Sequence, residues 1–427
     1  MNVLKIEYQN PYQVFLFLHS YGYPVHLFLD SALINEKTGR YSFIAVGMEE
    51  EFAVKGDVRA FEKLETFVYR LKGKYAVPEL PFGVFGFISY DANVFIEPSV
   101  KSEQIDDIGY PEIYFFLPET LFIFDNVEKQ AWCVTFSSLP KVNLISKPNG
   151  SFSARICGFN MTKDYFVSSV EKIKKYIAAG DTFQVNFSQR IDVDFEGDFL
   201  TLYHVLRSIN PSPFSFFLDF GDIKAVSCSP ERLLLKRGSL VETRPIAGTR
   251  PRGSNRKEEE AFQRELLLSE KERAEHIMLV DLERNDLGRV CKFGTVEVDE
   301  LMVLEKYSHV IHIVSNVKGI LKDGVSEIDV IKAMFPGGTI TGAPKVRTME
   351  IIAELEPTKR ALYTGSVGYI GFNGVMDFNI VIRTLLFRGG RGFLQVGAGI
   401  VWDSDPIKEY EETLHKGEAL IKALSSF

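Results

Sequence analysis

The chain has 427 residues, of which 45% are hydrophobic, and this is enough apolar material for a large core. No stretch approaches the roughly 18 consecutive apolar residues that span a bilayer, and residues 1–9 lack the pattern of a secretion signal. We therefore expect a cytoplasmic protein with no membrane partner. The formal net charge of −8 opposes binding to nucleic acid, and four widely spaced cysteines argue against a disulfide framework or a zinc site.

The N-terminal part of the chain is predicted to be rich in strands. Residues 25–29, 41–46 and 84–90 have strand composition and are separated by turn residues. The segment 146–153 gathers Pro, Asn, Gly and Ser between two more apolar stretches, as a linker does. We therefore divide the chain into an N-terminal β-rich region, 1–145, and a second region, 155–427.

The second region mixes helices with strands. Residues 163–179 have helical periodicity and stop at Gly180, and residues 258–283 are expected to form one long helix or two consecutive ones. Arg237-Gly238 and Asn373-Gly374 are hairpin signals between apolar runs, and residues 393–402 should pair next. The pattern predicts an α+β fold of large antiparallel sheets, sandwich-like, with helices packed outside.

Two later segments place pairs of carboxylates on the apolar stripe of a helix. At 100° per residue, Glu272 and Glu275 align with Leu279. Glu409 and Glu412 align in the same way with two alanines. Because a buried carboxylate needs a counter-charge, the four acids predict a shared cation site. The alternative is a solvated surface of Glu and Lys at i,i+4 spacing.

Three further features could carry chemistry. The Gly- and Pro-rich loop 335–345 precedes a predicted amphipathic helix, 346–355. The backbone N–H groups of this loop would suit a carboxylate ligand. The alternative is an ordinary loop with a helix cap. Arg383 interrupts an apolar strand and needs an anion, either a ligand or a structural ion-pair partner. Gly397 and Gly399 permit close approach of a ligand to a neighbouring strand.

His309, His312 and Glu231 are candidates for proton transfer. The two histidines would point to opposite faces of a strand, so a joint metal role is not expected, although either could act as a base. Glu231 lies at the end of a predicted strand and is a candidate proton donor.

These pieces, in this order, resemble the chorismate-using enzymes, which include anthranilate synthase component I, aminodeoxychorismate synthase component I, and the isochorismate and salicylate synthases. The resemblance is dense from about residue 164 to 423. It is carried by Asn210-Pro-Ser-Pro-Phe-Ser215, Ser229-Pro-Glu231, Arg244-Pro-Ile-Ala-Gly-Thr249, Ala274-Glu-His-Ile-Met-Leu-Val-Asp281, Tyr307-Ser-His309, the loop 335–345 and the segment 409–416. It implies that 155–427 is the chorismate-binding catalytic region.

The resemblance also implies residue roles. Glu275 and Glu412 would bind Mg²⁺ directly, and Glu272 and Glu409 would act through metal-bound waters. Glu231 would be the general acid that protonates the C4 hydroxyl of chorismate as it leaves. The matching histidine of anthranilate synthases, here His309, is thought to assist pyruvate elimination. The substrate pocket would be lined by Tyr369, Arg383, Thr339, Ala247, Gly397, Gly399 and Lys416.

Gln184 indicates which nucleophile, water or ammonia, attacks chorismate. Water-using members of the family have Lys at the matching position, where it can deprotonate water, and Gln cannot act as that base. We therefore expect ammonia, supplied by a separate glutaminase subunit, because no Cys here lies in an amidotransferase context.

The resemblance leaves two products possible, and the residues favour different ones. Ala247 is typical of anthranilate enzymes, whereas some aminodeoxychorismate enzymes carry Lys at the matching position. Because alanine has no nucleophile, covalent catalysis from position 247 is excluded. The loop 335–345 instead resembles the aminodeoxychorismate group. We favour 4-amino-4-deoxychorismate over anthranilate and pyruvate. A non-catalytic binding or regulatory paralogue is disfavoured because the implied catalytic residues remain.

A second ligand site is implied by the N-terminal region. The segments 29–32 and 39–42 resemble the tryptophan pocket of the family, although Asp30 replaces the more usual Glu. The residues that this resemblance assigns to the pocket are Asp30, Ser31, Pro211 and Phe214.

Overall fold

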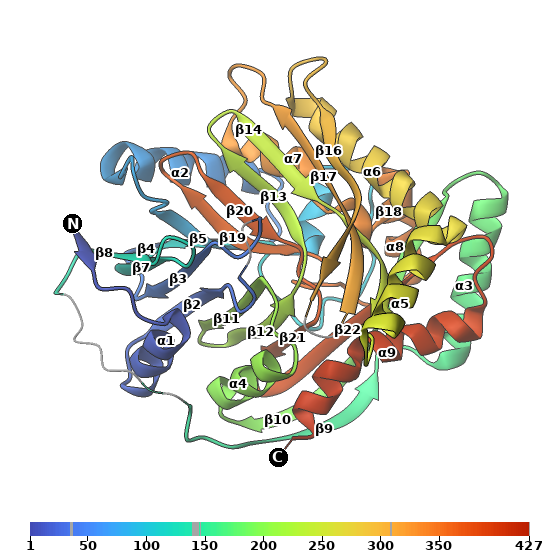
Figure 1. Ribbon diagram of the computed structural model, residues 1–427, viewed down its shortest axis with the longest axis horizontal. Helices are drawn as coiled ribbons and strands as arrows, with labels where there is room; N and C mark the ends of the chain where they lie inside the picture. Colours follow the sequence, from blue (N-terminus) through green and yellow to red (C-terminus); the bar gives the residue numbers. More distant parts are fainter. Residues whose placement is uncertain (35–36, 139–144, 146, 308–309, 427) are drawn as a thin grey trace.

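The computed structural model describes residues 1–34, 37–138, 145, 147–307 and 310–426. Within these residues the chain forms a 12-stranded and a 10-stranded sheet, and neighbouring strands in both are antiparallel (Figure 1). The α+β fold with large antiparallel sheets is therefore confirmed.

The first sheet has the order β1 (Asn2–Ile6), β8 (Gln130–Thr135), β7 (Thr120–Asp125), β3 (Tyr41–Val46), β2 (Val25–Asp30), β11 (Phe214–Phe220), β12 (Ile223–Ser229), β21 (Thr384–Arg388), β22 (Arg391–Ile400), β10 (Gln184–Gly197), β18 (Gly342–Ala343), with β9 (Phe152–Phe159) also on β10. The second has the order β15 (Ile246–Pro251), β17 (Val310–Ile320), β14 (Leu240–Arg244), β13 (Arg232–Arg237), β20 (Met376–Asn379), β19 (Ser366–Gly371), β5 (Gly83–Ile88), β6 (Ile113–Leu117), β4 (Glu50–Val54), with β16 (Glu297–Lys306) also on β17.

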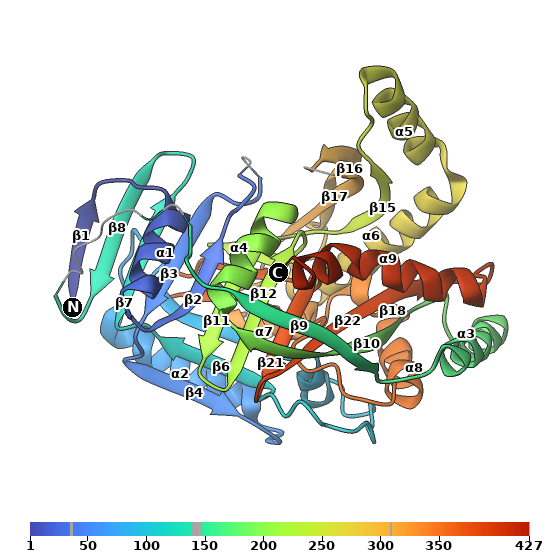
Figure 2. The ribbon, with the colours of Figure 1, turned by 90° about the horizontal axis from the view of Figure 1, so that it is seen from below.

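The helices are α1 (Pro11–Ser20), α2 (Ala60–Tyr75), α3 (Lys163–Ala178), α4 (Phe199–Ile209), α5 (Arg256–Leu268), α6 (Glu270–Val290), α7 (Glu327–Met334), α8 (Lys345–Leu355) and α9 (Pro406–Leu424), with 3-10 turns η1 (Tyr90–Phe95) and η2 (Gly338–Ile340). Figure 2 shows α5 projecting from the body, with α9 lying along the first sheet. No helix in these described ranges is long and apolar enough to cross a membrane.

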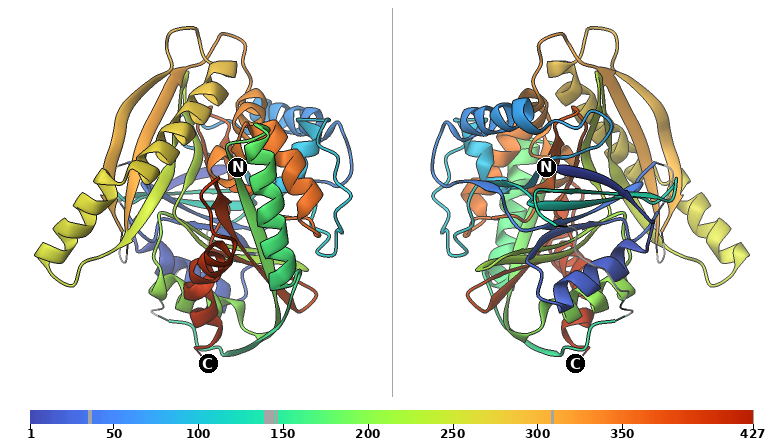
Figure 3. Two further views of the ribbon diagram at one scale, coloured as in Figure 1. Left: turned by 90° about the vertical axis from the view of Figure 1, so that its right-hand side faces the viewer. Right: turned by 90° about the vertical axis from the view of Figure 1, so that its left-hand side faces the viewer.

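Apolar side chains fill two layers. The larger core lies between the sheets, where the ring of Phe43 on β3 meets that of Phe85 on β5 at 5.4 Å. A second core lies under the helices α1, α4 and α9 (Figure 3). There Phe15 of α1 packs on Phe217 of β11, with ring centroids 5.2 Å apart. Burial of these aromatic faces on both sides of the first sheet explains why its central strands are apolar throughout.

Both sheets combine strands from the two sequence regions. Leu27 on β2 pairs with Leu218 on β11, and Gly86 on β5 pairs with Gly368 on β19. The segment 146–153 thus does not separate one sheet from the other. The division into 1–145 and 155–427 stays a prediction about sequence regions.

Most predicted elements are present. The helix expected at 163–179 is α3, the segment 258–283 forms two consecutive helices, α5 and α6, and both hairpin turns join paired strands. The apolar run that follows the Asn373-Gly374 turn does not form one strand, because the chain breaks between β20 and β21. There Arg383 has φ +53°, a left-handed conformation that no regular strand contains.

Candidate active site

The two acid-bearing segments are brought together by α6 and α9. The Ser269 side chain caps α6 by accepting a hydrogen bond from the backbone of Glu272, at 3.3 Å. Burial raises the pKa values of Glu275 on α6 and Glu409 on α9, and the positive charges of Lys271 and Lys416 partly offset that rise in both. Segments more than a hundred residues apart in sequence therefore share one electrostatic environment, and the cation site expected between them stays a prediction.

Glu275 and Glu409 point inward. Glu275 accepts a hydrogen bond from the side-chain amide of Gln184 at 2.7 Å, and burial raises its pKa. Glu409 is only 7% exposed and accepts a hydrogen bond from the hydroxyl of Ser404 at 2.6 Å. Burial is also the main cause of its raised pKa, with a smaller contribution from the Glu412 charge.

Glu272 and Glu412 are placed differently. Glu272 pairs with Arg250 at 3.2 Å, and Glu412 pairs with Lys416 at 2.8 Å with half of its side chain exposed. The prediction of an inward position is therefore wrong for Glu412. Across the described ranges, no three His, Cys, Asp or Glu side chains stand close enough together to hold a metal ion. Like charges repel, and each acid has instead taken a nearby donor or cation.

Glu231 lies between β12 and β13 with 4% of its surface exposed. One carboxyl oxygen accepts a hydrogen bond from the backbone N–H of Ile246 at 3.3 Å. Burial raises the pKa of Glu231 to about 7, although Thr339, the Ile246 N–H and the Arg383 charge partly offset that rise. A carboxyl group with this pKa still holds its proton in a substantial fraction of molecules at neutral pH, which suits a general acid.

Arg383 is half-buried beside Glu231. Its left-handed backbone turns the side chain out of the strand direction, and burial lowers its pKa, with partial compensation from Cys228, Tyr307 and Glu231. Within the described part of the chain, Arg383 forms no ion pair, so the alternative of a structural ion pair finds no partner there. Its guanidinium is placed to receive an anion.

Tyr369 does not lie with Arg383. It stacks on Phe85 at 5.5 Å and lines a pocket elsewhere between the sheets, so its prediction as a partner of Arg383 is corrected. Tyr363 lies at the site instead. A Cβ built on Gly397 would stand 2.9 Å from the Tyr363 hydroxyl. Tyr363 lies in a turn segment without periodicity, and the sequence carried no signal for it.

The two glycines of β22 face the other site residues. A side chain on Gly399 would collide with the Gln184 amide and come within 3.5 Å of a Glu275 oxygen. The Lys416 ammonium donates to the backbone carbonyl of Gly397 at 3.2 Å. Glycine here therefore preserves open space beside the acids, as the sequence suggested.

Thr339 and Ala247 complete the arrangement. The carbonyl of Thr339 accepts a hydrogen bond from the Asn186 amide at 3.3 Å, and its buried hydroxyl lies near enough to Glu231 to lower the pKa of that carboxyl group. Ala247 lies on β15 beside Gly248, where an added Cβ would come within 2.9 Å of a Glu272 oxygen. Asn186 was missed, although its position two residues after Gln184 places it on the same strand face.

The structure describes only one of the two candidate histidines. His309 lies outside the described residues, so its role stays a prediction. His312 is 2% exposed on β17, where its Nδ1 is 3.0 Å from the Thr249 hydroxyl. Burial lowers the pKa of His312 to about 3, and the Arg383 charge adds to this effect. The ring is therefore neutral at physiological pH.

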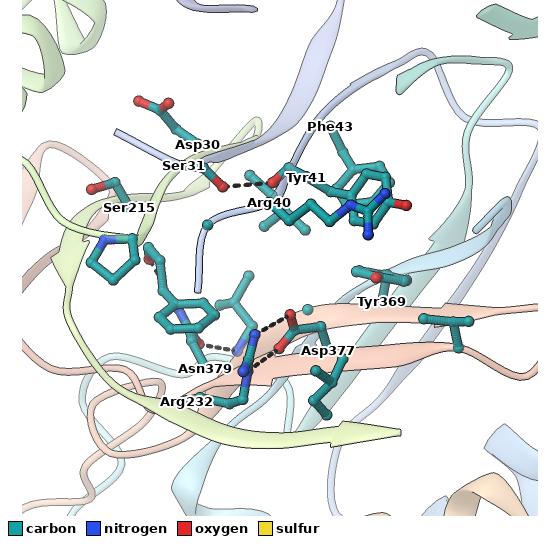
Figure 4. Close-up of a pocket in the computed structure, with 18 of the residues that line it drawn as sticks. Asp30, Ser31, Arg40, Tyr41, Phe43, Ser215, Arg232, Tyr369, Asp377 and Asn379 are labelled. Atoms are coloured by element: carbon teal, nitrogen blue, oxygen red, sulfur yellow. Dashed lines mark hydrogen bonds and ion pairs between the residues drawn. The ribbon is translucent and has the colours of Figure 1, made fainter. Parts of the chain in front are cut away.

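A pocket of about 60 Å³ lies at the predicted N-terminal site, and its role as a tryptophan pocket stays a prediction (Figure 4). Asp30, Ser31 and Phe214 line it, together with Tyr369. Pro211 is not among the lining residues, so that assignment is corrected. The Asp30 carboxylate accepts hydrogen bonds from Tyr203 and Arg207, at 2.8 and 2.6 Å, and in Figure 4 it points away from the other labelled side chains.

A buried ion pair fixes the strand that carries Gln184 and Asn186. Arg360 and Glu356 are both fully buried and approach to 2.7 Å. The guanidinium donates to the carbonyls of Asn186 and Ile340, at 2.7 and 3.0 Å, while Glu356 accepts from the Ser188 hydroxyl at 2.7 Å. The pair thereby joins β10 to the turn η2, and so positions Asn186 relative to Thr339.

Replacement of Arg360 by Met is expected to lower the free energy of unfolding by about 3–5 kcal/mol, because Glu356 is left as a buried, unpaired charge. Urea denaturation monitored by circular dichroism measures the loss. The double variant Arg360→Met/Glu356→Met removes both charges and should lose less. A double variant at least as unstable as the single one would contradict this explanation.

Comparisons with known proteins agree with the geometry. The family model described as chorismate binding enzyme matches residues 30–422. The aminodeoxychorismate synthase component 1 of Bacillus subtilis is 48% identical over 388 residues, covering 85% of this chain and 80% of that protein. The anthranilate synthase component 1 of Aquifex aeolicus is 41% identical over 465 residues, covering 99% and 93%.

Solved structures agree as well. The crystal structure of anthranilate synthase component I from Streptococcus pneumoniae has a TM-score of 0.77 at 32% identity, and the match covers 91% of this chain and 93% of that one. The matched family region contains each of the residues that surround Glu231 and Arg383. The chain belongs to the chorismate-binding enzyme family.

Proposed function

We propose that the protein is an aminodeoxychorismate synthase component I, which converts chorismate and ammonia to 4-amino-4-deoxychorismate for folate biosynthesis in the cytoplasm. The observation that carries the proposal is the buried Glu231, whose pKa is raised to about 7, beside the half-buried Arg383. Arg383 binds a substrate carboxylate, and Glu231 protonates the C4 hydroxyl as it leaves. The Bacillus subtilis relative, 48% identical, supports this choice of product.

Mg²⁺ is the cofactor in this proposal. Glu275 and Glu412 would hold it directly, and Glu272 and Glu409 through water. The donors suit the ion, because Mg²⁺ prefers carboxylate oxygens and keeps several waters. The raised pKa values of Glu275 and Glu409 express a cost of burial that a cation offsets. When bound, the ion neutralises the second carboxylate of chorismate.

Ammonia is the proposed nucleophile, and a separate glutaminase subunit is the proposed source. Gln184 touches Glu275 at 2.7 Å and carries no group that can take a proton from water. A neutral amine needs no such base before it attacks carbon.

The second candidate is an anthranilate synthase component I, which makes anthranilate and pyruvate. Ala247 and the Aquifex aeolicus relative, whose match covers 99% of this chain, favour it. Both candidates share Glu231, Arg383 and the acids. The two therefore differ in the ring carbon that receives nitrogen, C4 or C2, and in the fate of the enolpyruvyl group, rather than in the first bond broken.

A single assay separates the two candidates. The purified protein is incubated with chorismate, MgCl₂ and ammonium chloride, and pyruvate is followed through NADH oxidation by lactate dehydrogenase. We expect chorismate to disappear without pyruvate, and pyruvate to appear only after an aminodeoxychorismate lyase is added. Fluorescent anthranilate with an equal amount of pyruvate, before the lyase is added, would select the second candidate.

A further inference from the structure

The loop 335–345 is closed at its two ends by one buried lysine. Lys345 is the first residue of α8, and its ammonium donates a hydrogen bond to the carbonyl of Met334 at 3.2 Å. Met334 is the last residue of α7, so this bond joins the two helices that flank the loop. The same ammonium forms an ion pair with the buried Asp286 of α6. The ends of the loop are therefore fastened to α6.

A second buried acid of α6 holds the middle of the loop. Glu283 accepts a hydrogen bond from the backbone N–H of Gly338, the first residue of η2, at 3.3 Å. The turn lies so close to α6 that a Cβ on Gly338 would stand 2.6 Å from Leu282 and 3.1 Å from a Glu283 oxygen. Burial raises the pKa of Glu283, the Asp286 charge raises it further, and the Lys345 charge partly offsets the rise. The neutral carboxyl group is therefore favoured, and its carbonyl oxygen still accepts the bond from the turn.

Thr339 lies between two anchored residues of this turn. The backbone of the preceding residue is held by Glu283, and the carbonyl of the following residue accepts a hydrogen bond from Arg360 at 3.0 Å. The buried hydroxyl of Thr339 lowers the pKa of Glu231. A hydroxyl donor stabilises the carboxylate that remains after Glu231 has given up its proton. The position of the turn therefore influences how readily Glu231 releases that proton.

We propose that Glu283 is a positioning residue for the general acid: it holds the turn η2 on α6, so that the Thr339 hydroxyl stays against the carboxyl group of Glu231. This inference rests on the proposed function. Glu283 acts through a hydrogen bond and not through its charge, so the amide of glutamine can replace it, whereas a side chain without an acceptor cannot. Without an acceptor the buried Gly338 N–H is left unpaired, and the turn moves away from α6.

The charged and titratable groups near Glu231 come from several elements. Arg383, between β20 and β21, lowers the pKa of Glu231. Tyr307, which precedes β17, and Glu283 on α6 each have a pKa that the Glu231 charge raises. Neutral substitutions of Glu283 leave Arg383 and Tyr307 in place. A change seen with both methionine and glutamine at position 283 would therefore report lost charge, and a change seen with methionine alone would report lost position.

The test measures the pH midpoint above which chorismate consumption falls in saturating ammonium chloride. Glu283→Met removes the acceptor, and we expect this midpoint to rise by about one pH unit, the effect of one hydrogen bond on a carboxyl group. We also expect kcat to fall about three- to tenfold. Glu283→Gln keeps the acceptor, so its midpoint should stay with that of wild type. The fraction of free ammonia also varies with pH, but equally for every variant, so differences between midpoints report Glu231.

A second variant tests whether Glu283 acts through Thr339. Thr339→Val removes the hydroxyl itself and should raise the midpoint by a similar amount, and Glu283→Met should then add nothing in the Thr339→Val background. Glu112→Met is the matched control. Glu112 is another buried glutamate that accepts a hydrogen bond from a glycine, the Gly56 N–H at 2.7 Å, and it is not among the residues around Glu231. Its loss should leave the midpoint unchanged.

The outcomes separate this inference from the proposed function. If wild type consumes no chorismate with ammonium and Mg²⁺, the proposed function fails, and the inference fails with it. In an active wild type, the inference alone is overturned by an unchanged midpoint in Glu283→Met, by an equal shift in Glu283→Gln, or by additive shifts in the double variant. Thermal unfolding checks the fold of each variant. Should Glu283→Met not fold, Gly338→Ala decides, because its methyl group forces the turn away from α6, and an unchanged midpoint there would overturn the inference as well.

Discussion

Glu231→Gln is expected to lower kcat by about 10²–10⁴-fold, the usual contribution of a positioned general acid. Glutamine preserves the shape and can still accept the hydrogen bond from the Ile246 N–H, but it has no proton to give to the leaving hydroxyl. Because that proton moves only in the transition state, kcat and kcat/KM for chorismate should fall together. Steady-state kinetics of chorismate consumption with saturating ammonium measure both.

Asp91→Asn is the matched control. Asp91 is another carboxyl group whose pKa burial raises to about 7, and it accepts a hydrogen bond from the backbone of Ala361 at 2.9 Å. It is not among the residues around Arg383, so we expect its loss to leave kcat close to that of wild type. Wild-type turnover in Glu231→Gln would remove Glu231 from the mechanism.

The pH dependence of Glu231 has a definite sign. Its folded pKa of about 7 lies above the ordinary value of 4.5, so the native state binds this proton more tightly than the unfolded state. Stability is lost as pH rises from 4.5 through 7, and turnover falls as pH rises through 7. Glu231→Gln should therefore lack that falling limb, and above pH 7 it should be more stable than wild type by up to about 3 kcal/mol.

Glu275→Gln is expected to lower Mg²⁺-dependent turnover by about 100-fold or more, because it removes one charge from the proposed cation site. The fold should persist, since glutamine can still accept the hydrogen bond from the Gln184 amide. Thermal unfolding gives a readout independent of turnover. Added MgCl₂ should raise the melting temperature of wild type and not that of the variant.

Glu418→Gln supplies the control for charge alone, because Glu418 is an exposed residue of α9. The Glu418→Gln substitution removes the same charge as Glu275→Gln but from α9, so the melting temperature of this variant should rise with MgCl₂ as that of wild type does. An unchanged Mg²⁺ response in Glu275→Gln would mean that the cation binds elsewhere.

Sequence reasoning succeeded where local pattern decides the structure. Residues 41–46 form β3 because a short run of aromatic and β-branched residues suits a strand buried on both faces, and α3 ends before Gly180, whose φ of +81° few other residues adopt. The acid-bearing stripes of α6 and α9 were also expected to face inward, while the cation site they would share stays a prediction. Acids on an apolar helical stripe must turn toward an interior, and Glu275 and Glu409 do so.

Sequence reasoning failed where tertiary contacts decide. Glu412 shares the helical stripe of Glu409, yet it lies near the helix surface, where Lys416 one turn away offers a closer partner than the interior. Tyr369 and Tyr363 are both buried and lie only six residues apart, so composition could not tell which one reaches the glycines. Arg383 shows that one left-handed residue ends a strand that its apolar neighbours would otherwise continue.

The pairing of β2 with β11 and of β5 with β19 has a consequence for biosynthesis. During translation the early strands emerge with unpaired edges, and their partners follow roughly 190 and 280 residues later. Such distant pairing slows folding, since a long loop must close before any contact forms. The nascent chain is therefore exposed to edge-to-edge aggregation until late in synthesis, and either half produced alone would lack the neighbours that complete its sheets.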